Sequence, residues 1–136
     1  MIQHPVNVPV GNDQYVLVQD YICPVSGVIV RKDFVYDGAS VNRLLWTITG
    51  IRPDGPFRAG ATVHDWIYRH GGHVEIRDGE TIRRTTLSRR DADRIFRDLL
   101  VAAGVGCLQA YLAWCGVRCF GWYPWKTYDS KEQGIR

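Results

Sequence analysis

The chain has 136 residues, of which 46% are hydrophobic and 23% are charged, and its formal net charge is +3. This length allows one domain with a core of its own but not two, so residues 1–136 are predicted to form a single domain. The chain has no low-complexity segment and no run of the roughly 18 apolar residues that a helix needs to span a bilayer, and its composition is ordinary for a soluble globular protein.

Residues 1–36 are predicted to be rich in β-structure. Strand-forming residues fill 14–23 and 28–36, and the turn between them contains Pro24 and Gly27. This pattern predicts a hairpin or a small meander, with residues 6–10 as a third strand at its edge.

Residues 37–121 are predicted to form a helical core. Ser40 is a good N-cap and Gly50 a good stop, so residues 41–49 are predicted to be a short helix. Pro56 and Gly71 similarly bracket a longer helix over residues 57–70.

The second half of this core contains a hairpin and two helices. Asp78-Gly79 lies at the centre of alternating residues, so residues 73–84 are predicted to be a surface β-hairpin. A capping box at Ser88 begins a helix that runs to about Ala103. The last helix, residues 107–120, is apolar nearly all round, so it is predicted to be buried in the domain or covered by a partner.

Together these elements predict an α+β fold. Its parts are N-terminal antiparallel strands, an antiparallel helical hairpin with an inserted β-hairpin, and a buried C-terminal helix. Residues 122–136 form an aromatic and basic tail. No N-terminal signal peptide is apparent, and the four cysteines form no C-x-x-C pair. We therefore expect folding in a cytoplasm, with reduced and mostly packed thiols.

A histidine lies in the middle of the core-facing stripe of the helix at 57–70. Asp93 lies at the edge of the apolar stripe of the next long helix, so the two helices would bring it against His64. Asp93 would then accept a hydrogen bond from one ring nitrogen and leave the other as a general base toward water. Asp65 would be spare for a hard cation such as Ca²⁺, or would pair with an arginine. The alternative is a satisfied core histidine beside a solvated aspartate.

Two other sites are weaker candidates. His64, His70 and His73 would form a metal cluster with Asp65, but His70 lies on the opposite flank of the helix from Asp65. A cysteine nucleophile would have no basic neighbour except Arg118, and packed thiols are usually inert. The candidate cysteines are Cys107, Cys115 and Cys119.

Residues 77–97 contain seven arginines. Such a surface suits an anionic partner, such as phospholipid headgroups or another protein, although a solvated basic face is the commoner explanation. We do not expect nucleic acid among the partners.

Three motifs resemble those of small phage and prophage proteins of unknown function. They are YDGASV from Tyr36, AxxHDxxY from Ala61 and SRxxADxxF from Ser88, within a likeness that covers most of residues 34–121. The resemblance implies a phage-encoded protein that is made in the bacterial host cytoplasm. It also implies virion or tail proteins as partners.

The His64-Asp65-x-x-Tyr68 and Ala92-Asp93-x-x-Phe96 motifs more distantly resemble calcium-dependent secreted phospholipases and the phospholipase domain of parvovirus capsids. The resemblance implies that His64 activates a water molecule, that Asp93 orients the His64 ring and that Tyr68 supports this network. It also implies a calcium ion at Asp65, with Tyr36 and Gly38 of the upstream turn as further ligands.

Two functions remain open from the sequence. One is a hydrolase of lipid esters that acts on the host envelope, with His64 as base. The other is a non-enzymatic virion or tail-associated protein, in which the His-Asp-Asp network only holds two helices together. The oligomeric state is not predicted.

Overall fold

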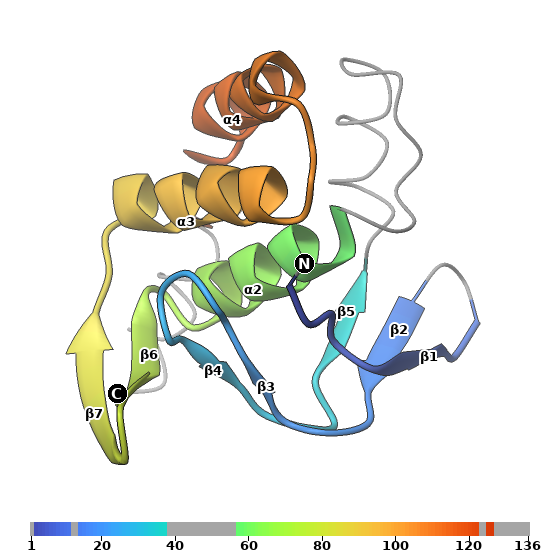
Figure 1. The fold of residues 1–136 in the computed structure, drawn as a ribbon, viewed down its shortest axis with the longest axis vertical. Helices are drawn as coiled ribbons and strands as arrows, with labels where there is room; N and C mark the ends of the chain where they lie inside the picture. The colour runs from blue at the N-terminus through green and yellow to red at the C-terminus, as the bar shows by residue number, and fades with distance from the viewer. Residues whose placement is uncertain (1, 12–13, 38–56, 123–124, 127–136) are drawn as a thin grey trace.

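The structure, a computed structural model, describes residues 2–11, 14–37, 57–122 and 125–126. Within these residues, short antiparallel strands come first, and three helices with a β-hairpin between the first two follow. Figure 1 shows the helices stacked one above another, with the N-terminal strands beside the lowest of them. The predicted mixed α+β class is confirmed.

The N-terminal strands form two small antiparallel sheets. Strands β1 (Asn7–Pro9), β2 (Gln14–Leu17) and β5 (Val35–Asp37) make one sheet in the order β1-β2-β5, and β3 (Tyr21–Ile22) pairs with β4 (Ile29–Val30) in the other. The third strand predicted at residues 6–10 is therefore confirmed as β1.

The predicted hairpin of residues 14–23 and 28–36 is present but interrupted. Asp33 has a φ of 70°, and its N–H donates to the carbonyl of Leu17 over 2.7 Å. The carboxylate of Asp20 accepts the backbone N–H of Lys32, also over 2.7 Å. Asp33 adopts a left-handed conformation, and the Asp20 side chain takes the place of a backbone acceptor for Lys32, so the ribbon bends into two sheets.

The helical hairpin with its inserted strands is also confirmed. Helix α2 (Phe57–Arg69) leads into β6 (His73–Asp78) and β7 (Thr81–Thr86), and helix α3 (Arg89–Ala102) then packs against α2. The two helices run in opposite directions (Figure 1). Ser88 caps α3 through the predicted capping box with Asp91.

The expected C-terminal helix, α4 (Cys107–Phe120), lies against α3. It is buried along one face only, which consists of Ala110, Ala113, Gly116 and Val117. Small side chains let two helices approach closely, and this explains why that face is the one in contact with α3. The opposite face is exposed, so complete burial within the described part of the chain is not observed.

Two groups of apolar side chains form the core. The larger joins α2, α3 and the N-terminal strands, and the smaller joins Phe57 to the facing sides of α3 and α4. The predicted helix at 41–49, the turn beyond Asp37 and most of the tail from Tyr123 lie outside the described residues. In the part of the chain that is described, no helix has the length and apolar character needed to cross a membrane.

Candidate functional site

Helix α2 places His64 and Tyr68 one turn apart on its buried face. Residues four apart in a helix lie on the same side, and the two ring centroids are 4.1 Å apart. His64 is 4% exposed and Tyr68 3% exposed. Phe96 of α3 packs against the imidazole with its ring centroid at 5.0 Å. The histidine predicted to face the core therefore does so.

Asp93 of α3 joins both rings through a single oxygen. Its Oδ1 lies 2.7 Å from Nε2 of His64 and accepts the hydroxyl of Tyr68 over 2.6 Å. The Asp93 side chain is fully buried. The predicted hydrogen bond between Asp93 and His64 is confirmed, and the predicted place of Tyr68 in the same network is confirmed with it.

Two arginines hold the other oxygen of this carboxylate. Arg118 of α4 donates to Oδ2 of Asp93 over 3.0 Å, and Arg89 lies 3.4 Å from the same oxygen. Arg89 also donates to the carbonyls of Val117 and Arg118 in the last turn of α4. The Asp93 side chain therefore links α2, α3 and α4.

Sequence reasoning did not assign either arginine to this network, although the sequence carries a signal for each. Arg118 is the only charge on an otherwise apolar helix, and a charge in that setting needs a partner. Arg89 precedes Asp93 by four residues, which is the spacing of a helical ion pair.

The surroundings of Asp93 keep it ionised. Burial alone raises the pKa of this carboxyl, but hydrogen bonds and charge from His64, Tyr68 and Arg118 outweigh burial and hold the pKa below its usual value. Burial and the adjacent Asp93 raise the pKa of Tyr68, so its hydroxyl stays protonated and donates.

The direction of the His64 hydrogen bond follows from this charge. An ionised carboxylate only accepts, so Nε2 of His64 must donate its hydrogen to Asp93. In the neutral ring, Nδ1 is then the nitrogen that carries a lone pair. No described residue forms a hydrogen bond with this Nδ1. The ring is thus fixed in an orientation that suits a general base.

Two of the three residues predicted to hold calcium, Asp65 and Tyr36, are described, and each has a partner other than Asp93. The carboxylate of Asp65 forms an ion pair with Arg69, with Oδ2 and Nε 3.2 Å apart. Tyr36, at the end of the N-terminal sheet, is buried, and its hydroxyl accepts a hydrogen bond from the Asn7 side chain. Burial raises the pKa of Tyr36, and the nearby Asp65 adds a smaller effect in the same direction. Gly38 lies outside the described residues.

The predicted cluster of histidines with Asp65 is not observed. His70 Nδ1 contacts the carbonyl of Trp66 over 2.7 Å, and His73 Nδ1 contacts the hydroxyl of Thr86 over 3.1 Å. Among the described residues, no group of three or more His, Cys, Asp or Glu side chains is placed to hold a metal ion.

The cysteines differ from the expectation of mostly packed thiols. Cys23 is buried, but Cys107 and Cys119 are exposed on α4, and all are free. Cys107 and Cys119 lie on the face of α4 that no described element covers. The apolar sequence of this helix did not distinguish that face from the face packed on α3.

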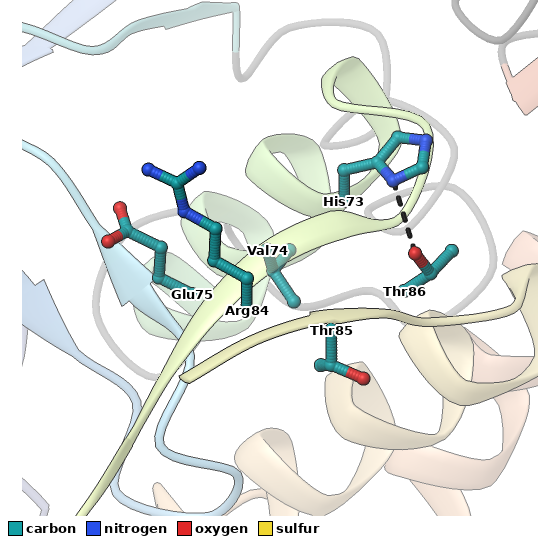
Figure 2. A pocket seen from close by; sticks show the side chains of 6 residues that line it. All are labelled: His73, Val74, Glu75, Arg84, Thr85 and Thr86. Atoms are coloured by element: carbon teal, nitrogen blue, oxygen red, sulfur yellow. Dashed lines mark hydrogen bonds between the residues drawn. The ribbon is translucent and has the colours of Figure 1, made fainter. Parts of the chain in front are cut away.

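A groove of about 440 Å³ lies on the β6–β7 hairpin, away from the Asp93 network. Figure 2 shows its lining side chains, including His73 with its hydrogen bond to Thr86. Because side chains alternate along a strand, His73 and Glu75 share one face with Arg84 across the ladder. None of the lining residues belongs to the Asp93 network.

Comparisons with known proteins place the chain in a family without supplying an activity. No curated protein matches the sequence, and no solved structure matches it. Residues 15–117, which include α2, α3 and every residue of the Asp93 network except Arg118, match the family described as "Protein of unknown function (DUF1353)". This match covers well over half of the chain, and the protein therefore belongs to the DUF1353 family.

Proposed function

We propose that this protein is a hydrolase of lipid esters in which His64 acts as the general base. One observation supports this more than any other: Oδ1 of Asp93 contacts both Nε2 of His64 and the hydroxyl of Tyr68. This shared contact fixes the imidazole and leaves Nδ1 as its basic nitrogen, which is the arrangement that the phospholipase resemblance implies.

In the proposed reaction, Nδ1 of His64 accepts a proton from a water molecule as the water oxygen attacks the ester carbonyl carbon. The ionised Asp93 stabilises the imidazolium that forms, and Arg118 and Arg89 hold its second oxygen in place. The tetrahedral intermediate collapses with cleavage of the bond to the alcohol oxygen, which takes the proton from His64. One ester and one water molecule give one carboxylic acid and one alcohol.

A calcium ion takes six to eight oxygen ligands. Of the residues predicted to supply them, the structure describes Tyr36 and Asp65, and the Asp65 carboxylate is paired with Arg69. Gly38 lies outside the described residues. The calcium prediction stays a prediction, to be tested by adding the ion to the assay.

The proposed setting is a phage or prophage infection of a bacterial host. The motifs at Tyr36, Ala61 and Ser88 support it by resemblance. In this setting the protein is made in the host cytoplasm and associates with the virion or tail, and the host-envelope phospholipids are its substrates.

A second function, a non-enzymatic virion or tail-associated protein, is favoured by a different observation. Both oxygens of Asp93 are occupied, by partners from α2, α3 and α4, and His64 is nearly inaccessible. A network of this kind also serves simply to hold three helices together.

The test is the release of fatty acid from phospholipid vesicles, with calcium and with a chelator. His64→Gln should lower the turnover by on the order of a thousandfold, because the base is removed. The amide can still donate to Asp93, so the melting temperature should change little. His73→Gln is the matched control, since this histidine is exposed on the hairpin and should leave the turnover unchanged.

The structural function predicts a different outcome. The wild-type protein would release no fatty acid under either condition. Any effect of His64→Gln would then appear only as a change in melting temperature, since there would be no activity to lose. That combination would exclude the hydrolase.

A further inference from the structure

Helix α4 carries an exposed apolar face on the side away from α3. It consists of the exposed Leu108, Tyr111 and Cys119 and the half-buried Cys115, which recur at helical spacing along one side. Leu108 is 70% exposed and Tyr111 is 52% exposed. We call this set the α4 apolar face. A contiguous apolar stripe on a helix surface indicates an interaction site, because single exposed apolar residues are common but stripes are not.

This face contains no free charge. The one charged residue of α4, Arg118, directs its guanidinium to Asp93 and is therefore engaged in the buried network. A face of this kind would not repel the apolar part of a lipid bilayer, because no unpaired ion must leave water.

A row of arginines on α3 borders the α4 apolar face. Arg90, Arg94 and Arg97 follow one another at spacings of four and three residues, which places them on one side of the helix. Arg90 and Arg94 are exposed. Arg97 is close to Asp98, at 3.6 Å, which offsets part of its charge.

Aromatic contacts connect the arginine row of α3 with the α4 apolar face. The Arg97 guanidinium lies 5.5 Å from the ring centroid of Trp114, and that ring is 5.7 Å from the ring of Tyr111. The arginine row therefore continues across Trp114 to the α4 apolar face, and basic and apolar groups meet along one edge.

We propose that α3 and α4 together form a docking surface for an anionic phospholipid bilayer. Leu108 and Tyr111 would enter the interface between headgroups and acyl chains, while Arg90 and Arg94 would contact the anionic headgroups. Charge complementarity selects this partner, because an uncharged surface would match the apolar face but not the arginine row. The inference rests on the proposed function, since it names where the protein would meet its lipid substrate.

The test measures co-flotation with vesicles in a reducing buffer. One set of vesicles contains phosphatidylglycerol in phosphatidylcholine, and the other contains phosphatidylcholine alone. The wild-type protein should bind the first set and bind the second weakly. The double variant Leu108→Gln/Tyr111→Ser should partition at least about tenfold more weakly, because two anchoring side chains lose their apolar surface. Arg94→Gln should weaken binding by about fivefold, since it removes one cation near the anionic surface.

Matched controls come from the β6–β7 hairpin. Ile82→Gln replaces another half-exposed apolar residue, and Arg83→Gln replaces another exposed arginine. Both should bind vesicles like the wild type. All the substituted side chains are largely exposed, so thermal melting should show that every variant folds.

Two results would overturn the docking surface. One is wild-type protein that does not float with anionic vesicles, or a double variant that floats equally well. The other is a wild-type dimer in sedimentation that the double variant abolishes, since a second copy would then cover the face.

The outcome is separable from that of the hydrolase proposal. His64→Gln should bind vesicles normally, and the double variant should hydrolyse a soluble short-chain ester at the wild-type rate. Binding without any ester hydrolysis would remove the hydrolase and leave the docking surface. Hydrolysis without vesicle binding would remove the docking surface and leave the hydrolase.

Discussion

His64 and Asp65 are neighbours in the chain, yet they lie in opposite environments. His64 is buried against Tyr68 and Phe96 and is oriented by the fully buried Asp93. Asp65 lies on the flank of the same helix and is paired with Arg69. In the phospholipase resemblance both residues serve one site. Here the residues on the histidine side are in contact, whereas Asp65 is paired with Arg69 and Gly38 lies outside the described residues.

The difference shows that helical spacing alone does not make a complete site. Facing stripes on two antiparallel helices bring one acid and one histidine together by packing. A calcium site needs several oxygens that converge from different segments, and a single carboxylate is satisfied at lower cost by a nearby arginine. Substitutions on each side test this difference.

The largest effect is expected from removing the charge that links the three helices. Asp93→Asn should lower the free energy of unfolding by about 3 kcal/mol, because two arginines lose their buried anionic partner. Asp98→Asn is the matched control on the exposed side of α3, and it should cost less than about 0.5 kcal/mol. Denaturant unfolding of both variants makes the measurement. Equal costs would mean that Asp93 does not hold the helices together.

A smaller effect is expected where the chain passes close to Tyr68. A Cβ at Gly121 would overlap the backbone carbonyl oxygen of Val117 and lie 2.6 Å from the Tyr68 hydroxyl oxygen. Gly121→Ala should therefore cost about 1–3 kcal/mol by overpacking, and should displace the hydroxyl from Asp93. Gly106→Ala is the control, because its Cβ would meet nothing closer than 3.6 Å. If thermal unfolding shows the two variants to be equally stable, Tyr68 has room to move.

The acid side of the stability curve should depend on Asp93. Its pKa is lower in the folded state, so its contribution to stability is present above the unfolded pKa of about 3.9 and is lost as pH falls through the folded value. Denaturant unfolding between neutral pH and about pH 2 should show this loss. In Asp93→Asn the free energy of unfolding should fall less steeply as the pH is lowered. An unchanged pH dependence would mean that other carboxylates cause the acid sensitivity.

Much of this arrangement could be predicted from the sequence. Local structure follows directly from the helical periodicity of apolar residues, the capping box at Ser88 and the turn at Gly79. Together these features place His64 opposite Asp93. The arginines were not assigned because Arg118 reaches Asp93 only when α4 packs on α3, and that contact joins residues 25 apart in the chain.

Other features depend on tertiary contacts that no local pattern encodes. The strand at 14–23 divides where the Asp20 carboxylate accepts the N–H of Lys32 and Asp33 adopts a left-handed conformation, and both depend on the partner strand being in place. The apolar sequence of α4 does not reveal which face meets α3, because Leu, Tyr and Cys residues lie exposed while Ala and Gly residues are packed.

The smallest effect concerns the calcium side. If Asp65 binds calcium, Arg69→Gln should tighten that binding by about twofold, because it frees the carboxylate from an ion pair on the same helix. Calorimetric titration of both proteins makes the measurement, with Arg77→Gln on the hairpin as control. An absence of binding heat at millimolar calcium in both proteins would remove the calcium prediction.

The most direct test of the central claim asks whether Asp93 acts through His64. Fatty-acid release from anionic vesicles should be compared for wild type, Asp93→Asn, His64→Gln and the double variant, each below its melting temperature. Asp93→Asn should lower turnover by on the order of a hundredfold, and the double variant should be no slower than His64→Gln alone. Wild-type protein without activity, or losses that multiply in the double variant, would contradict a base oriented by Asp93.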